Sequence, residues 1–187
     1  MRTLKTVVGT LLALVVTALI TAYSGLVNVA ASYPHAAVTK WLLHTTMTQS
    51  VKYHAKAGPP PPAGLKEMEG QGAKSFRQMC AQCHGAPGVD PDEIGKGLTP
   101  PAPDLGKEAS DWTAQELFWI IKNGVRLTGM PAWGPTHSDD QIWALTAFVL
   151  ALPGLTPERY RELSGGKPVR AHEHGESAGS AHRRHED

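Results

Sequence analysis

The residues best suited to chemistry are Cys80–Ala81–Gln82–Cys83–His84, near the middle of the chain. Two thiols three positions apart, near the end of a helix, can each add to one vinyl group of a haem, and the adjacent histidine then lies beneath the iron. The chain has only two cysteines, both in this motif, so no other thiol competes for a disulfide or a metal. The spacing predicts one haem c per chain, attached covalently by Cys80 and Cys83, with His84 as the proximal iron ligand.

Two other chemistries use a C-x-x-C pair. A thioredoxin-like redox dithiol requires a βαβ pattern around the pair, and the sequence shows none. A structural zinc site requires two further ligands at finger-like spacing, and none of the nine histidines stands in an H-x3–5-H arrangement close downstream. Both remain weaker alternatives to a haem.

A distal iron ligand is expected from Thr128–Gly134, the stretch TGMPAWG. Glycine and proline on either side of Met130 favour a loop that can present a thioether to a flat ligand. Met130 follows His84 by 46 residues, which is enough chain to circle a haem. We therefore predict that Met130 is the distal ligand, and His/Met ligation fills both axial positions and raises the reduction potential. The rival distal ligands are Met79, Met68 and His137.

The domain at residues 65–163 is expected to be helical, because no long alternating run of Val, Ile, Thr or aromatic residues predicts a strand. Good helix formers predict a first helix over Glu67–Met79, leading directly into the motif. Gly72 and Phe76 share one face of this helix, and the missing side chain at Gly72 would let a second helix approach closely.

Two capping boxes predict two further helices in the domain. Thr113-x-x-Glu116 opens a helix that Gly124 ends, and Ser138-x-x-Gln141 opens a closing helix that ends at Pro153. We expect Trp119 and Ile120 to lie in the core or the wall of the haem pocket. Trp143 and Phe148 of the closing helix are expected to pack against Gly72 and Phe76.

The charge distribution separates a basic leader from an acidic domain. Residues 1–63 contain five Lys or Arg and no acid, whereas residues 64–165 contain nine Lys or Arg and thirteen Asp or Glu. The formal net charge of +1 gives no indication of a nucleic-acid partner. Residues 1–31 include an uncharged apolar stretch from Thr6 to Ala31, which is long enough for the ~20 residues of a membrane-spanning helix. A cleaved secretory signal is the alternative, and either one delivers the rest of the chain to the periplasm.

Three segments flank the domain. Residues 32–57 predict an amphipathic helix with three lysines and no acid, suited to a membrane surface, to a docking contact or to a plain linker. Residues 58–64 contain four consecutive prolines and predict a stiff spacer that holds the domain off the membrane. Residues 164–187 are poor in apolar side chains and predict a disordered, His-rich tail that could bind metal loosely.

The motif set resembles the class I monohaem cytochromes c, in a membrane-anchored bacterial form. The resemblance covers residues 65–155 and rests on Cys80–His84, Gly72-x-x-x-Phe76 and Gly129–Met130–Pro131. It implies an all-α fold in which the first and last helices cross and loops wrap one haem. It also implies a proline carbonyl bonded to the haem-ligating imidazole, and Pro103 resembles that position, with Pro100 and Pro101 as nearby alternatives.

Two functions follow from this reading. The first is a membrane-tethered one-electron carrier that passes electrons between redox partners of a respiratory chain at the periplasmic face of the bacterial inner membrane. The second is a cytochrome subunit that relays electrons for a larger dehydrogenase or reductase complex. A haem catalyst is a third possibility and would require that Met130 leave the iron. We therefore predict an electron-transfer protein with no catalytic residues of its own.

Overall fold

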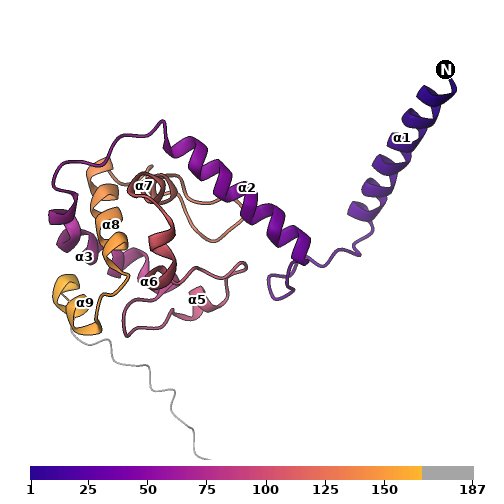
Figure 1. The fold of residues 1–187 in the computed structure, drawn as a ribbon. Helices are drawn as coiled ribbons and strands as arrows, with labels where there is room; N and C mark the ends of the chain where they lie inside the picture. Colours follow the sequence, from indigo (N-terminus) through magenta and orange to yellow (C-terminus); the bar gives the residue numbers. More distant parts are fainter. Residues whose placement is uncertain (166–187) are drawn as a thin grey trace, which may run out of the picture.

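The computed structural model describes residues 1–165, and its secondary structure there is helical apart from one isolated bridge between Ala86 and Val89 (Figure 1). The α-helices are α1 Arg2–Tyr23, α2 Ala37–Ala55, α3 Glu69–Met79, α4 Ala81–His84, α5 Glu93–Lys96, α6 Leu105–Glu108, α7 Ala114–Asn123, α8 Asp139–Ala151 and α9 Pro157–Ser164. Two 3₁₀ turns, η1 Leu65–Met68 and η2 Ala109–Asp111, complete the list. The all-α prediction is confirmed. The helix predicted over Glu67–Met79 is a 3₁₀ turn followed by α3.

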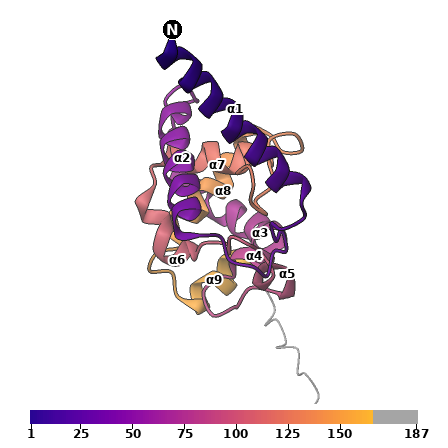
Figure 2. The same cartoon turned by 90° about the vertical axis from the view of Figure 1, so that its right-hand side faces the viewer.

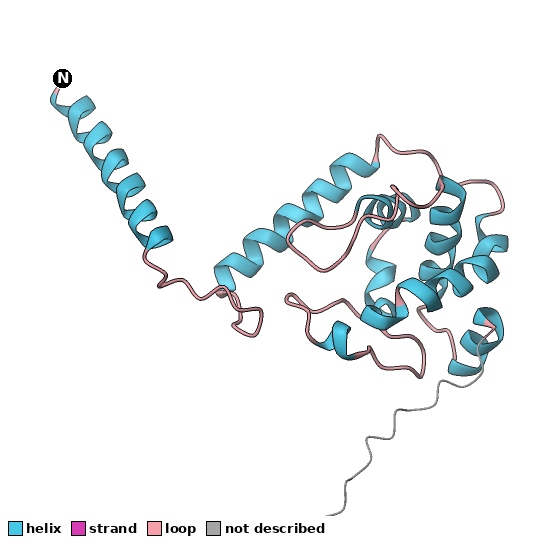
Figure 3. Cartoon of the chain, turned by 180° about the vertical axis from the view of Figure 1, so that it is seen from behind, coloured by secondary structure: helices cyan, strands magenta, loops and turns pink. Residues whose placement is uncertain are grey.

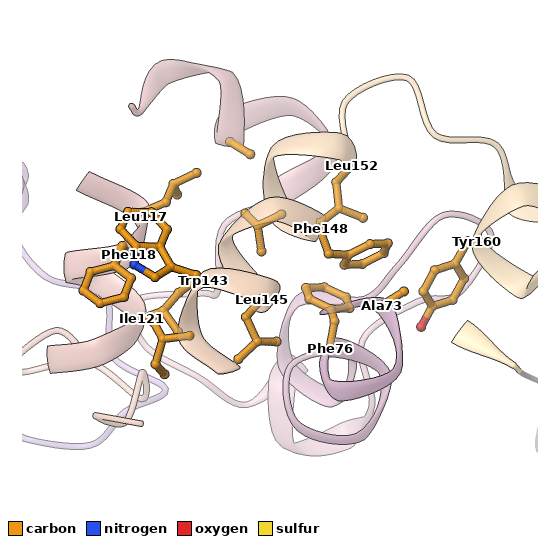
Figure 4. Close-up of a cluster of buried hydrophobic side chains, with 13 residues drawn as sticks. Ala73, Phe76, Leu117, Phe118, Ile121, Trp143, Leu145, Phe148, Leu152 and Tyr160 are labelled. Carbon is orange, nitrogen blue, oxygen red and sulfur yellow. The ribbon is translucent and has the colours of Figure 1, made fainter. Parts of the chain in front are cut away.

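The core of the domain surrounds α8, the closing helix. Figure 4 shows that side chains of α3 and α9 pack on one side of α8 and side chains of α7 on the other. Phe148 of α8 lies against Phe76 of α3, with ring centroids 5.1 Å apart, and against Tyr160 of α9 at 6.1 Å. On the other side, Trp143 stacks on Phe118 at 4.2 Å. The two helices predicted to meet, α3 and α8, are therefore in direct contact.

Gly72 is the residue that allows this contact to be so close. A Cβ atom at Gly72 would lie 1.9 Å from the backbone oxygen of Ala144 and 2.8 Å from the Cβ of Phe148. Real Cβ atoms do not approach a carbonyl oxygen this closely, so only glycine fits between the two backbones. The prediction that Gly72 and Phe76 form the crossing face is confirmed.

Both predicted capping boxes are formed. The hydroxyl of Thr113 accepts a hydrogen bond from the Glu116 backbone N–H, and the Glu116 carboxylate accepts one from the Thr113 N–H. Ser138 and Gln141 make the same reciprocal pair at the start of α8. These caps satisfy backbone donors that a helix start otherwise leaves without partners.

Trp119 lies at the edge of the core rather than at its centre. It is half-buried, stacks on His54 of α2 with ring centroids 5.8 Å apart, and lines a cavity described below, so its place in the wall of the haem pocket stays a prediction. The next residue, Ile120, is half-buried as well. Trp143 faces Phe118 of α7 instead of the Gly72 face, because successive turns of α8 are buried all round and meet different neighbours.

Helix α2 is packed against the domain, which the sequence did not predict. Its last turns lie along α7, and Val51 and Ala55 are 1% and 2% exposed (Figure 2). The proline segment is also in contact with the domain, since the Gln115 side chain donates a hydrogen bond to the Pro59 carbonyl at 3.4 Å. The prolines thus return the chain from α2 to η1. Residues 58–64 therefore do not separate α2 from the domain. That they hold the domain off the membrane stays a prediction.

Helix α1 extends away from the domain, and all of its residues are exposed (Figure 1). It is long and apolar enough to cross a membrane, with a mean hydropathy of 2.1 over its best window. At the other end, α9 runs through Ser164, one residue into the predicted tail. The histidines of that tail, at 172, 174, 182 and 185, lie outside the described residues.

Candidate haem site

The Cys80–His84 motif forms one continuous turn at the end of α3. The Cys80 N–H donates to the Phe76 carbonyl of α3, and the Cys80 carbonyl in turn accepts from the N–H groups of Cys83 and His84. Both cysteines are free thiols and half-buried. Burial, reinforced by the neighbouring Cys83, raises the pKa of the Cys80 thiol to about 12. The Cys80 sulfur is therefore held as a protonated thiol. The two cysteines lie three positions apart on one helical turn, a spacing that suits the two vinyl groups of one haem.

The imidazole of His84 is held by a single backbone contact. Its Nδ1 lies 3.0 Å from the carbonyl oxygen of Pro103. A carbonyl only accepts, so Nδ1 carries the proton and Nε2 keeps its lone pair. Burial lowers the pKa of His84, and the bond to Pro103 offsets part of this shift. The ring is thus a neutral imidazole with Nε2 available to a metal, in an orientation fixed by its partner. Of the three prolines considered, Pro103 is the one that makes this bond.

Two glycines fold the chain after His84 back over the motif. Gly85 has a φ of +68°, which suits glycine, and a Cβ there would lie 2.8 Å from the Val89 carbonyl oxygen. Further on, a Cβ at Gly95 would lie 2.8 Å from the Cα of Cys83. The short helix α5 therefore lies directly on the motif turn and holds it in place.

The loop that carries Met130 is folded against the end of α7. Gly124 ends α7 with a φ of +65°, and the Val125 N–H donates to the Met130 carbonyl at 3.2 Å. The Met130 N–H donates to the Thr128 hydroxyl at 3.1 Å. Leu127 has a φ of +64°, a conformation that is uncommon for a residue with a side chain. The Met130 side chain is half-buried and packs against the hydrophobic core.

The rival distal ligands lie elsewhere in the domain. Met68 and Met79 pack against the core from η1 and α3, as Met130 does from its loop. His137 lies edge-on to Trp133, with ring centroids 5.4 Å apart, and its Nδ1 is 2.9 Å from the Thr136 hydroxyl. Met130 differs from the other two methionines in lying on a loop rather than on a helix.

The donors fit a covalently attached haem better than they fit the two alternatives. Within residues 1–165, no cluster of three or more His, Cys, Asp or Glu is placed to hold a metal ion such as zinc. The same part of the chain has no βαβ unit around Cys80 and Cys83. A pair of free thiols, a neutral imidazole and a loop thioether are the groups that a His/Met-ligated haem c requires.

Sequence reasoning missed a cavity of about 1110 Å³, which is not lined by Cys80, Cys83, His84 or Met130. Its lining comes from α2 and from two segments, Thr99–Pro101 and Asn123–Thr128. Figure 3 shows, from behind, the loops that run alongside this helix. The inner face of α2 contributes Leu43, Met47 and Val51 to its wall. The only signal in the sequence was the absence of acidic residues from the α2 segment.

Comparison with known proteins supports the assignment to the cytochromes. Residues 67–149 match the family described as cytochrome c oxidase, cbb3-type, subunit III. The cbb3-type cytochrome c oxidase subunit FixP of Azorhizobium caulinodans is 39% identical over 85 residues, which are 45% of this chain and 27% of the relative. The chain thus matches about a quarter of that protein's length. No solved structure matches the chain.

Fold, motif and relatives agree on the haem and on the class of protein. The matched region begins two residues before α3 and ends inside α8, so it contains the motif turn, the Pro103 contact and the Met130 loop. The chain is therefore a c-type cytochrome, whose haem domain is similar to cbb3-type oxidase subunit III and follows a helix that can cross a membrane.

Proposed function

We propose that the chain is a membrane-tethered one-electron carrier in which His84 and Met130 occupy the two axial positions of a haem c held by Cys80 and Cys83. Bound haem c supplies an iron that exchanges one electron by cycling between the ferrous and ferric states. With both axial positions filled by protein, no position remains for a substrate. The protein's task is then to hold the iron in one coordination in both states.

The observation that carries this proposal is the His84–Pro103 contact. A histidine next to a C-x-x-C turn, with Nδ1 held at 3.0 Å by a carbonyl, has its Nε2 pre-oriented for iron. The same bond makes the imidazole a more basic ligand. The proposed ligation does not depend on any feature of α1 or α2, whereas the proposed tether rests on α1.

Met130 is supported as the distal ligand by the loop that presents it. The Thr128 hydroxyl and the Val125 N–H both bond the backbone of Met130, so the loop cannot move the thioether freely. A rigid distal ligand keeps the coordination unchanged on reduction, which favours rapid electron transfer over catalysis.

The membrane anchor and the acidic charge of the domain would determine where and how redox partners associate with it. We propose that residues 1–31 remain as an anchor, with Arg2 and Lys5 in the cytoplasm and the haem domain in the periplasm. The excess of acidic residues in 64–165 would steer the domain toward basic patches on its redox partners in a respiratory chain. Association rates should then fall as salt is added.

A second function is favoured by the matched relative, whose name places it in an oxidase complex. Here the chain would be a subunit that relays electrons within a larger oxidoreductase. The outer face of α2 offers a contact for such a complex, because Val38, Trp41 and Leu42 are 69%, 65% and 55% exposed.

Native mass measurement after mild detergent extraction distinguishes the two functions. A tagged full-length chain that leaves the membrane as a single haem protein, and that is reoxidised by membranes containing an oxidase, is the result expected for a carrier. Stoichiometric recovery of a catalytic oxidoreductase subunit would instead establish the subunit role. Binding of carbon monoxide to the reduced wild-type protein would contradict both, because it requires an open iron position.

Covalent attachment can be tested one thiol at a time. We expect Cys80→Ala and Cys83→Ala each to retain one thioether bond, so that the pyridine haemochrome band shifts toward that of a haem with one free vinyl group. The double variant should lose its haem to acidified organic solvent, whereas the wild type should keep it after denaturation. Extraction of haem from the wild type by the same solvent would show that the attachment is not covalent.

A further inference from the structure

The cavity beneath α2 has a distinctive charge. Its basic side chains are Lys40, Arg126 and the histidines at 35, 44 and 54, and none of its lining residues is Asp or Glu. This is unexpected beside a domain with more acids than bases. Within residues 1–165, no side-chain hydrogen bond or ion pair engages Lys40, His44 or Arg126. The cavity therefore gathers positive charge that the protein itself does not neutralise.

We propose that α2 closes the propionate edge of the haem, and that Lys40, His44 and Arg126 face the two propionate carboxylates across this cavity. The inference rests on the proposed haem site and adds to it a function for the α2 segment, which lies outside the matched family domain.

The position of the cavity along the chain supports this assignment. One of its loops, Thr99–Pro101, ends two residues before Pro103, which holds the proximal histidine. The other, Asn123–Thr128, ends two residues before Met130. Both loops thus lead directly into residues assigned to the two faces of the haem, so a haem held by His84 and Met130 would have the cavity at the far end of both loops.

The cysteines determine which edge of the haem faces the cavity. Cys80, Cys83 and the rest of α3 and α4 are absent from the cavity wall. The vinyl groups that bond to cysteine and the two propionates lie toward opposite edges of the porphyrin. A haem fixed to the motif turn by its vinyl carbons therefore directs its carboxylates away from α3 and α4, toward the other end of the two loops.

The helix that supplies Lys40 and His44 is fixed in place. Val51 and Ala55 are buried against α7, and His54 stacks on Trp119. Before α2, the Ala31 carbonyl accepts a hydrogen bond from the Thr99 hydroxyl at 2.5 Å. Contacts at both ends of the segment hold it over the cavity, so a cation on α2 has a defined place.

The positive charge of the cavity predicts the direction in which the midpoint potential of the haem should change. Carboxylates that lose water on one side need charged or hydrogen-bonding partners, and Lys and Arg supply charge-assisted bonds. A cation near the haem favours the ferrous state, which carries one positive charge fewer. Removing that cation should lower the midpoint potential.

The test compares Arg126→Gln and Lys40→Gln with Lys52→Gln, in the full-length haem-loaded protein in detergent at low ionic strength. Lys52 is a matched control, since it lies on α2, is exposed and does not line the cavity. We expect each cavity variant to lower the ferrous-to-ferric ratio at fixed potential about threefold, or ~28 mV at 59 mV per tenfold for one electron. Lys52→Gln should change the ratio by much less, and added salt should shrink the differences.

Resonance Raman spectra provide a readout that a loss of stability would not mimic. The propionate bending modes should shift in Arg126→Gln and Lys40→Gln and stay in place in Lys52→Gln. Potentials and propionate modes that match the control in both cavity variants would overturn the inference. That result, with covalent low-spin haem intact, would leave the proposed function standing, whereas a wild type without low-spin haem would refute the proposed function itself.

Discussion

Replacing Met130 with leucine will open the sixth position of the haem iron and lower its midpoint potential. A thioether ligand stabilises ferrous iron, so its loss should cost on the order of 0.1 V, within the ~0.8 V range that axial ligands span. Leucine is close to methionine in volume, and such swaps in a packed site usually cost less than about 1.5 kcal/mol. The variant should therefore fold, bind carbon monoxide when reduced, and show the lower potential in a redox titration.

Met79→Leu and Met68→Leu are the matched controls for this experiment. Both side chains are partly buried against the core, as Met130 is, and both were rival ligands. We expect the two control variants to keep the wild-type potential and to exclude carbon monoxide. An unchanged Met130→Leu, or the same loss in either control, would assign the distal position to another residue.

Gly72→Ala will destabilise the domain strongly. The added Cβ would lie 1.9 Å from the Ala144 oxygen and 2.6 Å from its carbonyl carbon, so the backbones of α3 and α8 must separate. Overpacking of this kind costs ~3 kcal/mol or more when backbone has to move. For a domain of this size, the melting temperature should fall by at least ~10 °C, measured by circular dichroism of the haem-loaded protein.

Gly70→Ala controls for the change of glycine to alanine itself. Gly70 lies two residues earlier in α3, and a Cβ there would have nothing within 4 Å. Alanine is the better helix former, so this variant should gain ~0.5–1 kcal/mol. Equal losses at both positions, or a Gly72→Ala variant that melts with the wild type, would contradict the close packing of α3 on α8.

The helices of the domain could be predicted from the sequence because the contacts that start and end a helix lie between residues close together in the chain. Capping boxes at Thr113 and Ser138 use hydrogen bonds within four residues. Gly72 and Phe76 share a face through helical periodicity alone, and the partner they needed was the apolar closing helix of the domain, α8. The partner of Trp143 could not be predicted in this way, because α8 is buried on all sides.

The packing of α2 against α7 could not be predicted from helical periodicity or capping motifs. Val38, Trp41 and Leu42 share a face with Val51 and Ala55, yet they are exposed and only the last turns of α2 meet α7. Periodicity indicates which residues can share a face, but the element that covers the face is set by contacts far apart in sequence. The proline run was equally ambiguous, since an extended segment can separate two elements or return the chain between them.

The candidate site also has one part that the sequence shows and one part that only the fold assembles. Cys80, Cys83 and His84 are fixed by spacing along one helix turn, and a sequence can display that spacing directly. The cavity is formed by α2, the loop at Thr99 and the loop at Arg126, which come together only in the folded chain. Its basic lining was therefore invisible until the three segments were placed together.

The axial ligation by His84 and Met130 is the central claim, and the optical spectrum of the purified wild-type protein tests it most directly. We predict a low-spin ferric haem with the weak sulfur-to-iron charge-transfer band at the red end of the spectrum, which is lost in Met130→Leu and kept in Met79→Leu. A high-spin ferric spectrum without that band, together with carbon monoxide binding on reduction, would contradict the assignment of this chain as an electron carrier.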